Sequence, residues 1–299
     1  MIKQVLGIDK IRMLYLQLLY RCNFDCIHCY HGERLKWRDA YTLDQAIQLL
    51  DLLANEYQLK ELTLLGGEPF VYKDVTEVLR HAKEDLGLRI DICTNAYKIE
   101  RQLRLSADHI DLLRVSLDGM AENNDRLRNK DSFEWAMRSL DLARDLGIPT
   151  SGTMTVNSLN VGDVIPLARA LAEKGSVKLN LHGIRVVGNA VDHPELALND
   201  QSYAQLNEAL DNAGDLGISL RLDPDLLNPT TEGDKEAEVP VENEELDRIE
   251  ADPRGALSFS CFAVGNDRNA FWFSKETGGI DYRPTGQDEV SRYLSLTVK

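Results

Sequence analysis

Three cysteines near the N-terminus have the residue type and the spacing of a metal site. Cys22, Cys26 and Cys29 form a C-x3-C-x2-C motif. Three thiolates on one loop can hold three irons of a [4Fe–4S] cubane and leave the fourth iron open to a reacting ligand. The alternative is a Cys3His zinc site completed by His28 or His31. The cubane predicts an enzyme, whereas the zinc site predicts an interaction protein without iron.

A glycine turn with a carboxylate follows some forty residues after these cysteines. Gly66-Gly67-Glu68-Pro69 ends an apolar run. Paired glycines let a backbone approach a ligand closely. A carboxylate can accept a hydrogen bond from an ammonium group. The turn is therefore a candidate ligand contact.

The elements that must position these motifs alternate between strand and helix up to about residue 190. Strand-like runs occupy 11–20, 61–67, 88–95, 110–119, 148–157 and 176–187, and helical patterns occupy 43–57, 75–86, 132–147 and 161–175. Such alternation predicts an α/β fold with a parallel sheet and helices packed outside it. Six strands favour a partial (β/α)6 barrel over a closed eight-stranded one. Ligands collect at the carboxyl ends of such strands, which is where the motifs fall.

The remaining chain has a weaker pattern. We expect a barrel domain over 1–190 and a C-terminal extension over 191–299, with a helix at 203–216 and a short strand at 219–224. Residues 232–252 hold ten acidic residues against Lys235 and Arg248, which predicts a solvated loop. A small β-region is expected around Cys261.

Composition narrows the function classes. The formal net charge of −15 argues against nucleic-acid binding and favours cationic partners. The apolar run at 11–20 is too short to span a bilayer and too interrupted for a signal peptide. Five cysteines, three of them clustered, do not form a secreted disulfide framework. We therefore expect a cytoplasmic protein that binds neither membrane nor nucleic acid.

The segment CNFDCIHCY (22–30) resembles the signature of the radical S-adenosylmethionine (radical SAM) superfamily, in the form typical of its SPASM and twitch branch. The resemblance implies one [4Fe–4S] cluster on the three cysteines and SAM bound to the open iron. One electron then cleaves SAM to a 5′-deoxyadenosyl radical that abstracts hydrogen. It also implies a flavodoxin or ferredoxin as electron donor.

Further positions resemble family motifs in the required order. The GGEP turn is similar to the motif that contacts the SAM amine, and Arg128 suits the SAM carboxylate, with Arg126 as a nearby competitor. The implied cofactor-binding residues are His28, Gly66, Gly67, Glu68, Pro69, Thr94, Asn95, Ser116, Asp118, Arg128, Thr155 and Val187.

The distal cysteine suggests a reaction type. SPASM relatives carry auxiliary clusters on a cysteine-rich extension, but only Cys261 follows Cys93 here, so we expect no second cluster. A thiol can return a hydrogen atom to a substrate radical, which makes Cys261 a candidate catalytic donor in an epimerase. A buried core cysteine is the other interpretation of Cys261, and Cys93 has the same two interpretations.

The chain resembles compact aminoglycoside epimerases, which predicts an isomerase of antibiotic biosynthesis acting on a small, polar, cationic sugar. A peptide maturase (an epimerase or crosslinker) and a sugar dehydratase or decarboxylase remain the alternatives.

Overall fold

The structure, a computed structural model, describes residues 1–223, 226, 241–242, 244–259, 269–288 and 290–291 of the 299-residue chain. Two compact units divide it. The first unit comprises Met1–Arg21, Trp37–Asp91 and Glu232–Lys299. The second comprises Cys22–Lys36 and Ile92–Thr231. The cysteine motif thus belongs to the second unit and the GGEP turn to the first.

The first unit contains α1 (Ile2–Leu6), β1 (Lys10–Gln17), α2 (Leu43–Tyr57), β2 (Glu61–Leu65), α3 (Val75–Arg80), β8 (Val241–Glu242), β9 (Glu245–Ala251), β10 (Ala256–Ser258), β11 (Phe271–Phe273) and β12 (Ile280–Tyr282). Strand β3 (Arg89–Thr94) leads into the second unit. That unit contains the 3-10 turn η1 (Gly32–Lys36), α4 (Glu100–Ser106), β4 (Leu112–Ser116), α5 (Ala121–Leu127), α6 (Ser132–Asp145), β5 (Thr150–Val156), α7 (Val164–Glu173), β6 (Lys178–Gly183), the 3-10 turn η6 (Gly188–Asp192), α8 (Asp200–Asp211) and β7 (Ser219–Leu222).

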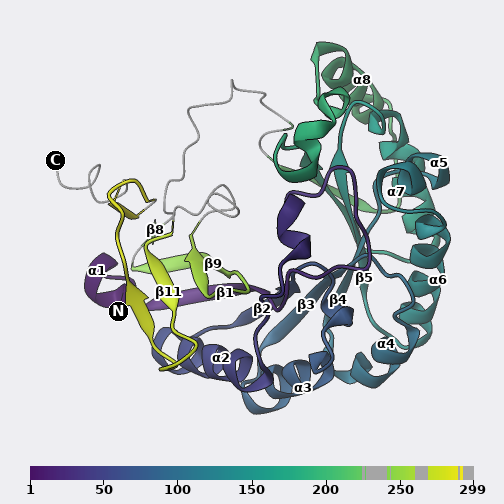
Figure 1. Cartoon of the computed structure of the whole chain (residues 1–299). Helices are drawn as coiled ribbons and strands as arrows, with labels where there is room; N and C mark the ends of the chain where they lie inside the picture. Colours follow the sequence, from purple (N-terminus) through teal and green to yellow (C-terminus); the bar gives the residue numbers. More distant parts are fainter. Residues whose placement is uncertain (224–225, 227–240, 243, 260–268, 289, 292–299) are drawn as a thin grey trace. The chain divides into compact units, whose positions relative to one another are not determined.

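The sheet order is open at both ends. It runs β12-β11-β10-β9-β1-β2-β3 in the first unit and β3-β4-β5-β6-β7 in the second. The pairs β1–β2, β4–β5 and β5–β6 are parallel. Among the described strands the sheet does not close into a barrel, which confirms the predicted α/β fold with a partial barrel. Within the second unit, α4, α6 and α7 lie along the outer side of the strands (Figure 1).

The sequence explains why one face of β5 and β6 is covered. Met154 and Val156 on β5 are fully buried, while Thr153 and Thr155 between them are half-buried. Alternation of this kind puts the apolar set on the helix side and the polar set on the opposite face. A Cβ on Gly152 would lie 2.4 Å from Leu171 of α7, so the glycine allows helix and strand to pack closely. The polar face is left for ligands.

Most predicted elements are confirmed at their positions, including the helix at 43–57, which begins with a capping box of Thr42 and Gln45. Three helices, α1, α4 and α5, were not predicted. The expected helix at 75–86 changes into a π-helical turn at His81–Asp85. In this turn, His81 Nε2 lies 2.7 Å from Asp51 Oδ1 and His81 Nδ1 lies 2.8 Å from Asp85 Oδ2.

The acidic stretch differs from the solvated loop that we expected. Its described part includes β9, which pairs in parallel with β1. Leu246 and Ile249 are fully buried, and Glu250 accepts a hydrogen bond from Gln17 at 2.6 Å. Charge counting missed this strand because its apolar residues and paired charges decide the local structure. Residues 232–240 and 243 lie outside the described part of the chain. The division at residue 190 stays a prediction.

Along the described residues, no helix has both the length and the apolar character that crossing a membrane requires.

Candidate active site

The cysteine loop is held by backbone contacts within the second unit. Cys29 N donates to Cys26 O at 3.1 Å, and Gly32 N donates to Cys29 O at 3.2 Å. Ile27 N donates to Leu127 O, the last residue of α5, at 3.1 Å. The loop is therefore a tight turn tied to α5.

The three thiols are neighbours on half-buried residues. Burial raises the pKa of both Cys26 and Cys29, and the nearby guanidinium of Arg128 opposes this by favouring the thiolates. Charges on Cys22 and Cys29 further raise the pKa of Cys26. Crowded thiols of this kind ionise together when a metal centre neutralises them.

Next to the cysteine loop, His28, Asp118 and Arg128 form a buried network of polar contacts. His28 Nε2 is 3.0 Å from Asp118 Oδ2, and Arg128 Nε is 2.6 Å from the same oxygen. The side chain of Asp118 is fully buried, and those of His28 and Arg128 are 8% and 11% exposed. A residue inside the cysteine motif is thereby fixed to two residues about ninety positions further along the chain.

Asp118 has partners on every side. Its Oδ1 accepts from Thr155 N at 2.7 Å, its own N donates to Asn124 Oδ1 at 2.7 Å, and its O accepts from Asn160 Nδ2 at 2.9 Å. Burial alone would raise the pKa of Asp118, but Arg128 and His28 outweigh burial and lower it. The carboxylate is therefore ionised and rigidly placed at neutral pH.

The structure separates the two arginines between which the sequence left a choice. Arg128 caps the end of α5 and reaches Asp118, whereas Arg126 is exposed to solvent. Burial lowers the pKa of Arg128, but the combined attraction of Asp118, Cys26 and Cys22 outweighs burial and raises it. Arg128 is the arginine that the buried network includes.

Asn95 also contacts the cysteine loop, and Thr94 shapes the turn that follows β3. Asn95 Nδ2 donates to Asn23 Oδ1 at 2.7 Å and lies 3.7 Å from Cys22 Sγ. Thr94 Oγ1 accepts from Ala96 N at 2.9 Å and so shapes the turn after β3. Amide donors near a cysteine sulfur are a typical means of tuning an iron–sulfur site.

Sequence reasoning missed Gly188 and Asn189, which hold the loop from the start of η6. Asn189 N donates to Cys29 O at 2.9 Å, and its Nδ2 donates to Cys26 O at 2.9 Å. A Cβ on Gly188 would lie 2.3 Å from Cys29 O. The predicted residue Val187 directly precedes this contact. The signal in the sequence was a single Gly-Asn pair after a strand, which usually marks only a turn.

Replacing Gly188 with alanine should disrupt the cysteine loop, because backbone atoms, which cannot yield easily, occupy the space. We expect a loss of about 2–4 kcal/mol in the free energy of unfolding and a low iron content after reconstitution. Gly214→Ala is the control, since Gly214 has nearly the same φ (62° against 61°) but no atom within 4 Å of its Cβ position. Denaturant titration and iron analysis of both variants check this; equal losses would contradict it.

The GGEP turn of the first unit uses its glycines for chain packing. A Cβ on Gly66 would lie 2.7 Å from Leu19 O, and one on Gly67 would lie 2.2 Å from Arg21 O. Glu68 is 1% exposed and its carboxylate accepts from Phe70 N at 3.1 Å. The close approach that we expected toward a ligand is made here toward the segment that follows β1. Pro69 is buried and starts a 3-10 turn.

The remaining predicted residues are less constrained. Ser116 is half-buried at the end of β4, and Cys93 is half-buried on β3. Cys261, the predicted hydrogen donor, lies outside the described residues.

The donor set fits an iron–sulfur cubane. Nδ1 of His28 is buried without a hydrogen-bond partner, and Cys22 Sγ accepts N–H donors from Phe24 and Asn95. Within the described residues, no three His, Cys, Asp or Glu side chains are placed to share one metal ion. A cubane has a different requirement, because each thiolate binds its own iron.

Comparisons with known proteins agree with this chemistry. Over 207 residues, the chain is 28% identical to the Fe-coproporphyrin III synthase of Methanosarcina barkeri, covering 68% of this chain and 51% of that protein. It is 28% identical over 207 residues to the mycofactocin maturase MftC of Mycolicibacterium smegmatis, covering 66% and 52%. The chain spans about half the length of these curated relatives.

Solved structures show the same fold. SuiB of Streptococcus suis bound to S-adenosylmethionine superposes with a TM-score of 0.71 at 17% identity, covering 89% of this chain and 64% of that chain. SuiB bound to the precursor peptide SuiA gives a TM-score of 0.67 at 15% identity, covering 89% and 63%.

The family model of the Radical SAM superfamily matches residues 16–171, more than half of the chain. This match contains the cysteine motif, the GGEP turn, Asp118 and Arg128. The protein therefore belongs to the radical SAM superfamily and is an enzyme that uses a [4Fe–4S] cluster and S-adenosylmethionine.

Proposed function

We propose that Cys22, Cys26 and Cys29 hold the cluster and that the network of His28, Asp118 and Arg128 fixes the loop that carries it. The observation that carries this proposal is the burial of Asp118 between His28, from the cysteine motif, and Arg128. A buried carboxylate that an arginine and a histidine hold is costly to build unless its geometry matters. Here its consequence is a single orientation of the loop.

When bound, the cluster supplies the electron that cleaves SAM and so provides the radical that abstracts hydrogen. The chain's own residues bind and orient. Arg128 has five N–H donors, of which Nε faces Asp118, so its other donors suit the carboxylate of SAM. In the first unit, Glu68 is the proposed acceptor for the SAM amine. The remaining proposed cofactor contacts are Gly66, Gly67, Pro69, Thr94, Asn95, Ser116, Thr155 and Val187.

For the reaction, we propose epimerisation of a small, polar, cationic sugar with Cys261 as hydrogen donor. The formal net charge of −15 supports a cationic substrate, because a negative protein concentrates cations around it. Peptide maturation is the second candidate, supported by the fold shared with SuiB, which has been solved with a precursor peptide.

Turnover in deuterated water tests both candidates. The reduced holoenzyme is incubated with SAM and either aminoglycosides or synthetic peptides. The mass of each recovered compound is then measured by mass spectrometry. We expect a sugar to gain one mass unit at carbon, because a thiol exchanges its hydrogen with solvent and returns deuterium. Cys261→Ala should still cleave SAM but give no labelled epimer, whereas Cys93→Ala should behave as wild type.

If a peptide gains deuterium and no sugar does, the substrate is a peptide and the sugar proposal is wrong. Full labelling by Cys261→Ala would show that Cys261 is not the donor.

A further inference from the structure

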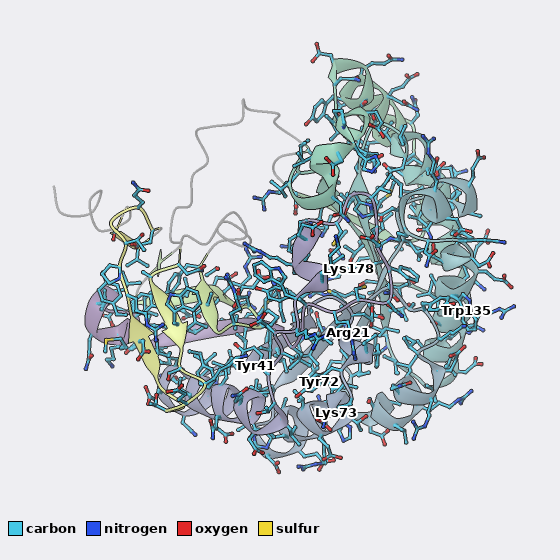
Figure 2. All side chains as sticks on the ribbon, in the orientation of Figure 1. Arg21, Tyr41, Tyr72, Lys73, Trp135 and Lys178 are labelled. Carbon is cyan, nitrogen blue, oxygen red and sulfur yellow. The ribbon has the colours of Figure 1, made fainter. Side chains whose placement is uncertain are left out.

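Three aromatic rings connect the cysteine loop with the solvent-facing part of the second unit. Phe24 lies between Cys22 and Cys26 and is 4% exposed. Its ring centroid is 5.3 Å from that of Tyr97, which is 5.4 Å from that of Trp135 on α6. Tyr97 and Trp135 are half-buried, and Trp135 lies at the outer side of the second unit (Figure 2). The contacts lead from the cluster loop outward without a break.

The turn that carries Tyr97 has an unfavourable backbone. Ala96 and Lys98 have φ values of 63° and 57°, a left-handed conformation that residues other than glycine rarely adopt. Ser139 Oγ donates to Ala96 O at 3.0 Å, and Asn95 Oδ1 accepts from Tyr97 N at 3.0 Å. Surrounding contacts therefore impose a conformation that keeps Tyr97 against Phe24, as is typical of functional sites.

Two cations flank the outer end of this series of rings. Lys98 Nζ is 4.9 Å from the ring centroid of Tyr97 and 5.7 Å from that of Trp135. Arg138 Cζ is 5.5 Å from the centroid of Trp135. Both cations are exposed, although Arg138 also pairs with Glu134.

Helix α4 adds further cations near these two, since it begins two residues after Lys98 and packs on α6. Arg101 and Arg104 are exposed, and Leu105 beside them is 56% exposed. With Lys98 and Arg138, this surface has four cations against two acidic residues, Glu100 and Glu134, in a chain of net charge −15. An exposed leucine surrounded by charged residues is typical of a protein interface, which has an apolar centre and a polar rim.

We propose that this electron-entry surface (Lys98, Arg101, Arg104, Leu105 and Arg138) docks an acidic, low-potential one-electron carrier protein. The inference rests on the proposed cluster at Cys22, Cys26 and Cys29. In the step, one electron leaves the flavin or iron–sulfur group of the carrier, which is oxidised by one electron. The group on the cysteines is reduced by one electron, and no covalent bond forms. The opposite charges steer the encounter, and the rings shorten the gap to the cluster loop.

Binding of a flavodoxin to the holoenzyme tests the proposal without relying on turnover. Isothermal titration calorimetry compares the wild type with the double variant Lys98→Glu/Arg138→Glu. At about 0.05 M salt the double variant should bind about tenfold more weakly or worse, and at about 0.5 M salt the difference should largely vanish. SAM cleavage driven by flavodoxin should fall similarly, while cleavage driven by dithionite should stay within about twofold of wild type.

Arg144→Glu is the matched control, because Arg144 is an exposed arginine of the same helix that pairs with Asp141 and Asp145. Unchanged flavodoxin affinity in the double variant, or an equal loss in Arg144→Glu, would overturn the proposal. A loss of dithionite-driven cleavage in the double variant would also overturn it, since these residues would then act on the loop. If the wild type does not cleave SAM with dithionite, the proposed cluster assignment is wrong, and the docking surface is not the cause. A ferredoxin in place of flavodoxin distinguishes the two carriers.

Discussion

Cys26→Ala should abolish SAM cleavage, the largest single effect that we expect. The thiol of Cys26 is surrounded by its two partners and by Arg128, and two thiolates hold a cubane far less well than three. After anaerobic reconstitution, the wild type should contain about four irons and four sulfides. The variant should lose most of both, together with the brown absorbance.

Cys93→Ala is the control, because Cys93 is a half-buried cysteine on β3 just before Thr94 and Asn95. It should retain iron, sulfide and SAM cleavage. The same iron loss in both variants would mean that the cysteine loop has no special role, and zinc bound in place of iron would favour the alternative Cys3His site.

Asp118→Asn should strongly destabilise the second unit. The substitution keeps the shape but leaves Arg128 buried without its anion, which costs about 3–5 kcal/mol. Because Asp118 orients His28, iron content and SAM cleavage should fall as well. Asp223→Asn is the control: Asp223 pairs with His182 at 2.7 Å but is 44% exposed, so its loss should cost less than about 1 kcal/mol. Urea titration measures both.

The pH dependence of stability gives a second signature of Asp118. The pKa of Asp118 is lower in the folded state than in the unfolded chain, where it is near 4. The ionised carboxylate therefore stabilises the fold above about pH 4, and this stabilisation is lost as the pH falls from there toward the pKa of the folded state. The unfolding free energy of the wild type should therefore decrease more steeply between about pH 5 and pH 3 than that of Asp118→Asn. Parallel profiles would contradict the assignment of an ionised, ion-paired Asp118.

Local patterns were sufficient for most of the helices and strands up to about residue 190. Helix α2 shows its apolar spacing and its Thr42 cap directly in the sequence, and the motif around Asp118 marked that residue. The choice between Arg126 and Arg128 could not be made from spacing. It depends on where α5 ends, and α5 is a short helix without a strong periodic pattern.

Long-range pairings were beyond the sequence for a different reason. Strand β9 looks like a charged loop until its partners are known, because Gln17 of β1 and Arg12 provide the contacts that its acids need. Asn189 has the same problem, since its role depends on the distant carbonyls of Cys26 and Cys29. The sequence also does not show why residue 67 must be glycine, because the carbonyl that leaves no room for a Cβ there belongs to the distant residue Arg21.

The most direct test of the central claim is the 5′-deoxyadenosine formed by the reconstituted protein with SAM and dithionite under anaerobic conditions. We expect the wild type and Cys93→Ala to form equimolar 5′-deoxyadenosine and methionine, and we expect Cys22→Ala, Cys26→Ala and Cys29→Ala to form neither. A wild type that holds four irons but forms no 5′-deoxyadenosine would contradict the assignment of a radical SAM cluster to these cysteines. So would a cysteine-motif variant that still forms it at the wild-type rate.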